Sequence, residues 1–254
     1  MKNKLTDELA VCGMNAVLAV AEHNPQTINR LFLREERLKS FTSVCKQLAE
    51  RKRPYKICED EELERICKSV HHQGVVAMIE EPVVEPLSLE DLELWAAERK
   101  TGVLLHSIGN DHNLGAIARA AAFFDASFIV LNEKDSTFEG NEARLTTSAY
   151  RVAEGGLEHL TVRRISSSSS FLKDASKQLI TIGTDTRARM RISDLGGIVN
   201  KKGIVLVLGN EETGLPKEVK DKCSYLLRIP GTGNIDSLNV SQAAALFLHA
   251  IYEL

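Results

Sequence analysis

Hydrophobic and polar positions in the first 80 residues follow an alternation of helix and strand. Three segments carry apolar residues at helical spacing and are predicted to be helices: 13–21, 41–51 and 61–69. Three short apolar or β-branched runs are predicted to be strands: 28–33, 55–58 and 74–79. Asp60 is the expected N-cap of the third helix. The pattern predicts a small α/β unit.

A proline-containing acidic segment follows this unit. Residues 80–90 hold two prolines and four glutamates. Proline lacks a backbone donor and neighbouring carboxylates repel, which predicts a linker rather than a packed element. A helix is expected to follow over 89–98. We therefore predict a first domain at 1–80, a linker with a connecting helix at 81–99, and a second domain at 100–254.

In the second domain, continuous apolar strands alternate with helices. The predicted strands are 103–107, 127–131, 179–183, 203–208 and 225–229, and the predicted helices are 114–124, 171–177 and 238–252. This alternation indicates an α/β fold with a mostly parallel sheet covered on both faces. Ligands of such sheets bind beyond the carboxyl ends of the strands. The serine run 166–170 is expected to be a solvated turn that caps the next helix.

Composition limits the class of protein. The 254 residues suffice for two domains, and 43% hydrophobic with 26% charged residues is typical of a soluble globular chain. No apolar run reaches the roughly 20 residues needed to span a membrane, and the N-terminus has no secretory signal pattern. Five scattered cysteines without a C-x-x-C pair disfavour disulfides and zinc, and indicate a cytoplasmic protein.

Charge alone does not indicate a nucleic-acid partner. Residues 1–98 hold 13 Lys and Arg against 18 Asp and Glu, a net charge of −5, and residues 99–254 hold 19 against 17, a net of +2. Any RNA contact therefore has to use local clusters. The candidates are Arg51-Lys52-Arg53 and the group of Arg30, Arg34 and Arg37. Ordinary solvated faces explain such clusters equally well.

Polar residues that could carry chemistry follow three of the predicted strands. In 106–124, Asn113 stands at the expected start of a helix and Arg119 lies further along it among alanines. In 203–216, the strand runs directly into Gly209, Asn210 and Glu211. Each feature also has a structural reading, in which Asn113 only caps, Arg119 only extends to solvent and Glu211 is only solvated.

The third segment, 228–251, is a glycine-containing loop that opens the last helix. Gly231 and Gly233 precede Ser237, Leu238 and Asn239. A glycine-rich loop before a helix N-terminus can hold an anion or a nucleotide, but Ser237 could also be only an N-cap. A parallel sheet would bring all three segments to one edge.

The three segments together resemble one family. The motifs are Asn-Leu-Gly-Ala-Ile-x-Arg, Leu-Gly-Asn-Glu-x-x-Gly-Leu and Ile-Pro-x-x-Gly-x-x-x-Ser-Leu-Asn-Val-Ser-x-Ala, in that order. They resemble the SpoU (TrmH) family of RNA methyltransferases, in the SPOUT superfamily, over about 102–254. Residues 151–159 and the Gly-Thr-Gly-Asn loop look most like the YfiF-type branch. Residues 12–17 resemble the start of the substrate-binding domain of many members, which is similar to small ribosomal RNA-binding proteins.

The resemblance implies a fold, a reaction and a site. The second domain would contain a deep trefoil knot, and the protein would be a homodimer that transfers a methyl group from S-adenosylmethionine to a ribose 2′-hydroxyl of tRNA or rRNA, without a metal. The residues implied at the chemistry are Arg119, Asn113, Glu211, Ser237 and Asn239. Those implied at the cofactor are Thr184, Leu208, Gly209, Asn210, Ile229, Pro230 and Leu238.

The role of Arg119 stays open between two chemistries. A guanidinium has a pKa above about 12 and is a difficult base. Arg119 could act as a base after losing its proton to a nearby phosphate, or could stabilise the alkoxide that develops on the ribose. His106 and His112 lie near the first motif, and we expect structural or solvent-facing roles for both.

Three other functions have to be weighed. A SPOUT enzyme could methylate a base nitrogen, although Ser237-Leu238-Asn239 favours ribose. The chain could be a non-catalytic RNA-binding protein of the same fold, which the intact Asn113, Arg119, Glu211 and Asn239 disfavour. A dinucleotide-binding oxidoreductase is disfavoured because no G-x-G-x-x-G follows the first strand of either domain.

Overall fold

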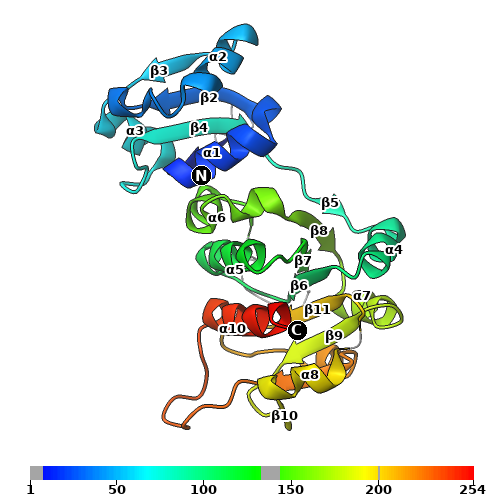
Figure 1. Cartoon of the computed structure of the whole chain (residues 1–254). Coiled ribbons are helices and arrows are strands. Elements are labelled where there is room, and N and C mark those ends of the chain that lie inside the picture. The colour runs from blue at the N-terminus through cyan, green and yellow to red at the C-terminus, as the bar shows by residue number, and fades with distance from the viewer. Residues whose placement is uncertain (1–7, 133–143, 200) are drawn as a thin grey trace. The chain divides into compact units, whose positions relative to one another are not determined.

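The computed structural model describes residues 8–132, 144–199 and 201–254, which form two compact units (Figure 1). The first unit contains the chain up to Val83 together with Arg144–His159. The second unit contains Val84–Ala143 and Leu160–Leu254. The domain limits expected from sequence, 1–80 and 100–254, stay a prediction. The segment 144–159 adds a helix to the first unit that the hydrophobic pattern did not indicate.

The first unit is built on a four-stranded sheet in the order β1-β4-β2-β3. Its strands are β1 (Glu8–Cys12), β2 (Ile28–Leu33), β3 (Tyr55–Ile57) and β4 (Val75–Glu80). Its helices are α1 (Met14–His23), α2 (Thr42–Glu50), α3 (Asp60–Cys67) and α6 (Thr147–Ala153). β4 runs antiparallel to β1 and β2, and β3 is an edge strand parallel to β2.

Two details of the first unit differ from the sequence-based expectation. β1 was not predicted, because its apolar run continues without a polar break into the apolar positions of α1; Gly13, with φ 99°, ends the strand. Asp60 is not the N-cap of α3 but its first residue, and Glu59 precedes the helix. The Asp60 carboxylate instead accepts a hydrogen bond from Arg34 at 2.6 Å.

The second unit contains an eight-stranded sheet in which every neighbouring pair is parallel. The order is β10-β12-β9-β11-β6-β7-β8-β5. The strands are β5 (Glu85–Pro86), β6 (Thr101–Leu105), β7 (Phe128–Asn132), β8 (Thr161–Ile165), β9 (Ile180–Thr184), β10 (Met190–Arg191), β11 (Ile204–Leu208) and β12 (Tyr225–Arg228). The predicted parallel α/β sheet is confirmed.

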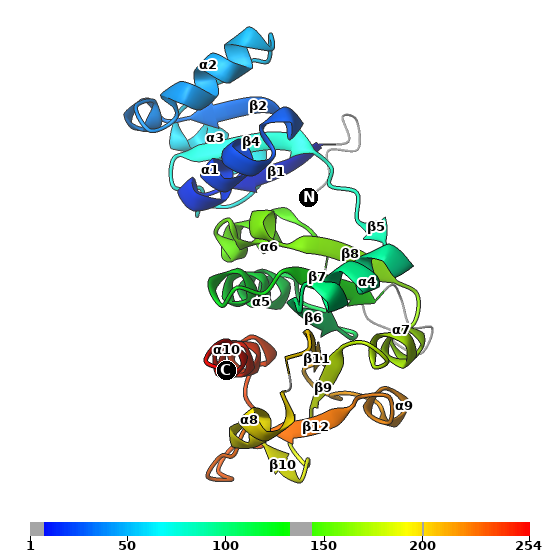
Figure 2. The same cartoon turned by 45° about the vertical axis from the view of Figure 1, so that its right-hand side comes forward.

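Helices cover both faces of this sheet (Figures 1 and 2). They are α4 (Leu89–Ala97), α5 (Asp111–Phe123), α7 (Ser168–Ala175), α8 (Leu195–Ile198), α9 (Lys217–Lys220) and α10 (Val240–Tyr252). α5 packs against α10, and α4, α7 and α9 close the core on the other face. In that core the Trp95 ring stacks on Phe128 at 3.7 Å, and a side chain at Gly102 would overlap the other side of the same ring.

The strand order reverses direction between β6 and β11. From β6 the chain proceeds outward through β7 and β8, then crosses to β9 on the other side of β6. β11 later fills the position between β9 and β6, and the chain leaves it toward β12. In open parallel sheets, the carboxyl ends of strands at such a reversal form a crevice that binds ligands. The trefoil knot stays a prediction.

The expected linker is partly ordered structure. Glu85 and Pro86 form β5, which pairs with β8 at the edge of the sheet. Arg164 Nε donates to the carbonyl of Val84 at 2.8 Å, and Arg163 Nε donates to the Asp91 carboxylate at 3.0 Å. Proline is tolerated here because an edge strand pairs on one side only.

Candidate active site

The loops after β6 and β11 meet at the carboxyl edge of the second unit. Leu105 and Leu208 end the two strands in register, and the next backbone N–H, of His106, donates to the carbonyl of Leu208 at 2.9 Å. Ser107 then turns the chain with a left-handed φ of 53° and is buried. A non-glycine residue in this conformation costs free energy, and such residues cluster at functional sites.

Three of the residues predicted at the chemistry form a hydrogen-bonded chain. Asn113 Nδ2 donates to Glu211 Oε1 at 2.6 Å, and Asn239 Nδ2 donates to Asn113 Oδ1 at 3.2 Å. Asn239 Oδ1 accepts from the backbone N–H of Ser241 at 2.8 Å. The three residues lie 98 and 126 positions apart in the sequence.

The two ends of this chain fix the orientation of both amides. A carboxylate only accepts hydrogen bonds, so Asn113 has to present its NH₂ group to Glu211 and its oxygen to Asn239. A backbone N–H only donates, so Asn239 has to present its oxygen to Ser241. Hydrogen bonds that run in the same donor-to-acceptor direction polarise one another, and together they hold the three side chains rigid. The Glu211 carboxylate therefore aligns both asparagines.

The helix starts differ from the sequence-based expectation at both sites, since α10 begins at Val240 with Asn239, not Ser237, as its N-cap. Asn110, not Asn113, is the N-cap of α5, and its side chain accepts from the backbone of His112. Asn113 is the third residue of the helix and is only 9% exposed. Because Asn110 satisfies the helix end, the Asn113 side chain is available for Glu211. Asn239 both caps α10 and bonds to Asn113.

Asn210 joins the loops after β6 and β11. Its Nδ2 donates to the carbonyl of Ser107 at 2.9 Å, and its Oδ1 accepts from the backbones of Glu212 and Thr213 at 3.0 and 3.1 Å. The Thr213 hydroxyl also donates to Oδ1 at 3.2 Å. The side chain that was predicted at the cofactor is therefore engaged in holding the two loops together.

Replacing Asn210 by alanine is expected to lower the free energy of unfolding by about 1–3 kcal/mol, because the Ser107 carbonyl and the loop donors lose their partner. Thr213→Ala removes one of these bonds and is the matched control, with an expected loss below about 1 kcal/mol. Denaturant unfolding measures both. Equal losses in the two variants would contradict the interpretation that Asn210 holds the loops after β6 and β11 together.

The other residues predicted at the cofactor lie at the carboxyl ends of three neighbouring strands. Thr184 ends β9, Leu208 ends β11, and Ile229 follows β12. The Thr184 hydroxyl donates to the carbonyl of Val207 at 3.3 Å. A side chain at Gly209 would come within 2.5 Å of the backbone at Gly214 and Leu215, so only glycine lets the 209–214 loop fold back here. Pro230 and Leu238 lie in the exposed loop before α10.

Arg119 and Ser237 occupy exposed positions. Arg119 lies on a face of α5 that it shares with His112 and Phe123, which are also exposed. Ser237 lies in the exposed 230–239 loop, and within the described residues its side chain has no hydrogen bond. The hydrogen-bonded chain thus contains three of the five predicted residues.

Two polar pairs near this edge, one half-buried and one buried, were not predicted. The Asp185 carboxylate, directly after β9, accepts from Lys220 Nζ at 2.8 Å and from the backbone of Arg187. Burial alone would raise the pKa of Asp185, but these bonds outweigh it and lower the pKa. His106 Nδ1 and the Ser168 hydroxyl lie 2.9 Å apart and both residues are buried. The serine run therefore supplies a cap, Ser167, and a buried partner, Ser168.

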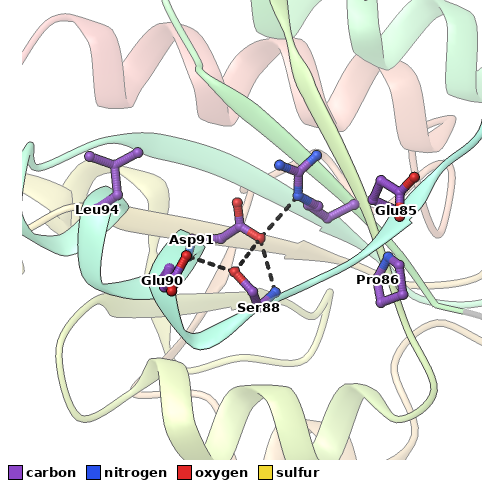
Figure 3. A pocket seen from close by; sticks show the side chains of 7 residues that line it. Glu85, Pro86, Ser88, Glu90, Asp91 and Leu94 are labelled. Atoms are coloured by element: carbon purple, nitrogen blue, oxygen red, sulfur yellow. Dashed lines mark hydrogen bonds and ion pairs between the residues drawn. The ribbon is translucent and has the colours of Figure 1, made fainter.

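A hollow of about 380 Å³ lies elsewhere in the second unit, beside β5, β8 and α4 (Figure 3). Glu85, Glu90, Asp91 and Arg163 contribute to its wall. Figure 3 shows the Asp91 carboxylate bonded to Ser88, and the same carboxylate accepts from Arg163 Nε at 3.0 Å. Ser88 and Asp91 form a capping box at the start of α4, so these two side chains of the hollow have a structural role.

The described residues hold neither a cluster of metal-binding side chains nor a helix that could span a membrane. Within 8–132, 144–199 and 201–254, no three His, Cys, Asp or Glu side chains are grouped so that they could hold a metal ion. In the same residues, no helix combines the length and apolar character required to cross a membrane.

Two family models match the chain. The model of the SpoU rRNA methylase family matches residues 100–249. A model described as RNA 2′-O ribose methyltransferase substrate binding matches residues 10–83. The first match covers more than half of the chain and contains every residue of the site. The family and the accompanying domain predicted from the motifs are confirmed.

Individual proteins agree with these matches. A guanosine-2′-O-methyltransferase of 23S rRNA, RlmB of Bordetella pertussis, is 28% identical over 94% of this chain and 94% of its own. YfiF of Escherichia coli O157:H7, named as an uncharacterized tRNA/rRNA methyltransferase, is 26% identical over 98% of this chain and 69% of its own. The crystal structure of the SpoU methyltransferase AviRb from Streptomyces viridochromogenes, in complex with AdoMet, superposes with a TM-score of 0.72 and 21% identity, over 98% of this chain and 91% of that one.

Proposed function

Because the chain belongs to the SpoU rRNA methylase family, we propose that it transfers a methyl group from S-adenosylmethionine to a ribose 2′-hydroxyl of tRNA or rRNA. The observation that carries this proposal is the Glu211–Asn113–Asn239 chain at the reversal between β6 and β11. It joins three motifs that are far apart in sequence at the edge where parallel sheets bind ligands.

The names of the relatives support ribose as the target. RlmB is named for 2′-O-methylation of guanosine in 23S rRNA, and the first unit matches a substrate-binding model named for 2′-O ribose methyltransferases. Base methylation is the alternative within the same superfamily. Digestion of the labelled product RNA to nucleosides distinguishes the two.

The residues at the strand ends suit S-adenosylmethionine. Ile229 is half-buried directly after β12 and offers an apolar side chain, and Gly209 lets the 209–214 loop fold back tightly at the end of β11. We propose that Thr184, Leu208, Gly209, Ile229, Pro230 and Leu238 hold it. When bound, it supplies the methyl group.

The chain's own residues would align and activate the ribose. Glu211 holds Asn113 and Asn239 in one orientation, so that the pair positions the nucleotide for attack. Arg119, exposed on α5, stabilises with its guanidinium the negative charge that develops on the 2′-oxygen. Ser237, in the exposed loop before α10, is the last of the residues that we propose to contact the RNA substrate.

The proposal is tested by incubating the purified protein with tritiated S-adenosylmethionine and total bacterial RNA, followed by separation of tRNA from rRNA. We expect label in one of these fractions, recovered as a 2′-O-methylnucleoside. Tight cofactor binding in calorimetry without incorporation would indicate that a precursor RNA or a partner is required. Absence of cofactor binding would reject the methyltransferase and leave an RNA-binding protein of this fold.

We also propose that the protein acts as a homodimer through α5 and α10. Four large apolar residues on and next to these helices are exposed: Phe123 (79%), Leu246 (46%), Tyr252 (58%) and Leu254 (60%). Phe123 lies one turn from Arg119 on the same face of α5. Association over this face would therefore place the reactive arginine beside the partner subunit.

Replacing Phe123 by aspartate is expected to convert the dimer to a monomer, since a buried unpaired carboxylate opposes association. Light scattering coupled to size exclusion measures the mass. Leu94→Asp, at an exposed apolar position on α4 (52%), is the matched control and should leave the mass unchanged. A Phe123→Asp variant that stays dimeric would place the interface elsewhere.

A further inference from the structure

The structure distinguishes the two basic clusters of the first unit. In the group of Arg30, Arg34 and Arg37, each guanidinium has a partner within the unit. Arg30 pairs with Glu8, Arg34 donates to Asp60 at 2.6 Å, and Arg37 Nε donates to the carbonyl of Gln73 at 3.0 Å. All three side chains are half-buried. This group therefore stabilises the fold of the unit.

The segment Arg51–Ile57 has the opposite character. All seven residues, Arg-Lys-Arg-Pro-Tyr-Lys-Ile, are exposed. Within the part of the chain that the structure describes, the side chains of Arg51, Lys52 and Arg53 form no ion pair or hydrogen bond. Favourable charge at the C-terminus of α2 explains a cation at Arg51, but the effect fades beyond the last turn. The fold of the first unit therefore does not explain why three cations follow one another here.

The backbone of this segment is fixed, and of its four cations only Lys56 has a partner, the Glu62 carboxylate at 2.7 Å. The N–H groups of Lys52 and Arg53 donate to the carbonyls of Ala49 and Leu48 at the end of α2. The carbonyl of Pro54 accepts from Leu31, and β3 then pairs with β2. Tyr55 and Ile57 alternate with Lys56 along the strand and are 45% and 47% exposed. An aromatic ring thus stands next to three cations on a rigid base.

We propose that this segment, Arg51–Ile57, is a binding surface for single-stranded RNA. The cations contact successive phosphates, and an unpaired base stacks on the Tyr55 ring. This is the combination of a basic track and an aromatic platform by which proteins hold single strands with little sequence preference. The inference rests on the proposed function and names the part of the first unit that holds the substrate.

A protein strand is the less suitable occupant of this edge. β3 pairs on one side only, and its other side could in principle accept another strand. Pro54, however, lacks an N–H at the start of the edge, and Lys56 is charged, two features that oppose edge-to-edge pairing. The segment carries four cations, of which Lys56 pairs with Glu62. Arg51, Lys52 and Arg53 form no such pair within the described residues and are complementary to phosphate.

The test measures how salt weakens binding of a fluorescein-labelled 12-nucleotide polyuridine RNA to the full chain by fluorescence anisotropy. The triple variant Arg51→Gln, Lys52→Gln, Arg53→Gln should bind at least tenfold more weakly at 50 mM salt. Its slope of log affinity against log salt should be shallower by about 2, at about 0.7 for each lost phosphate contact. Tyr55→Ala should weaken binding about tenfold without changing the slope, and Tyr55→Phe should bind like the wild type.

The matched control removes three exposed cations from the other unit. Lys201, Lys202 and Lys222 precede β11 and β12, at the edge of the sheet opposite the candidate active site. Their replacement by glutamine changes the net charge equally and should leave affinity and slope unchanged. Equal effects of the two triple variants would overturn the surface, as would equally tight binding of a 12-base-pair RNA duplex.

The same preparations separate this inference from the proposed function. Binding of S-adenosylmethionine, measured by calorimetry, should be unchanged in the Arg51–Arg53 and Tyr55 variants. If these variants methylate RNA at the wild-type rate and bind it with unchanged affinity, the RNA-binding surface is rejected and the proposed enzymatic function is retained. RNA binding that depends on the segment, without any methylation, would support the surface and reject the enzyme.

Discussion

Replacing Arg119 by alanine is expected to reduce methyl transfer about 10²–10³-fold while S-adenosylmethionine binding stays within about threefold of the wild type. The arginine lies on the exposed face of α5, whereas the residues proposed to hold the cofactor lie at and after the ends of β9, β11 and β12. Its loss would remove a preorganised charge aimed at the reacting oxygen, a type of group whose removal alone commonly costs 10²–10³-fold in turnover. Single-turnover transfer of tritiated methyl and calorimetry measure the two effects separately.

His112 and Arg119→Lys serve as controls. His112 shares the exposed face of α5 with Arg119, and His112→Ala should retain near wild-type turnover. Arg119→Lys keeps a charge but loses the planar fork, and partial activity with an unchanged pH profile would support electrostatic stabilisation. An activity that rises with pH in Arg119→Lys would instead support a base, because a lysine loses its proton more readily. Near wild-type turnover of Arg119→Ala would refute both roles.

The fold of the second unit could be predicted from sequence because its strands have a strong signature. β11 and β9 are buried apolar runs, and β6 and β12 are similar, so their limits were predicted to within two residues. β8 was missed because it carries two arginines, Arg163 and Arg164, which bond to Asp91 and Val84. Such partners are distant in sequence, so no local pattern reveals that a charged segment lies in a sheet.

The candidate site was predictable in its members and not in its connections. The resemblance to the SpoU family implied site roles for Asn113, Glu211 and Asn239, but the bonds between them span 98 and 126 residues and depend on the strand order. The same resemblance implied Asn210 at the cofactor, which stays a prediction, and gave no sign that its side chain bonds to Ser107 and Thr213. Asp185 and Ser168 were missed for the same reason, since each is defined by a distant partner, Lys220 and His106.

A second large effect is expected from Asn113→Asp, which changes an amide to a carboxylate of nearly the same shape. Asn113 Nδ2 now lies 2.6 Å from Glu211 Oε1, and two ionised carboxylates cannot share that distance. Asn113 is only 9% exposed, so an aspartate there would be poorly solvated, whereas Glu211 stays exposed to solvent. We expect turnover to fall at least 10²-fold, because Asn113 and Asn239 lose the alignment that Glu211 imposes.

The double variant Asn113→Asp, Glu211→Gln is the decisive comparison. It restores one donor and one acceptor across the 2.6 Å contact, with the amide and the carboxylate exchanged between the two residues. If alignment is the function of Glu211, the double variant should recover at least tenfold of the activity lost in Asn113→Asp, so that the two substitutions are strongly non-additive. If Glu211 instead acts through its own charge on the substrate, the second substitution should lower the activity further, and the hydrogen-bonded chain would be a structural feature of the loop.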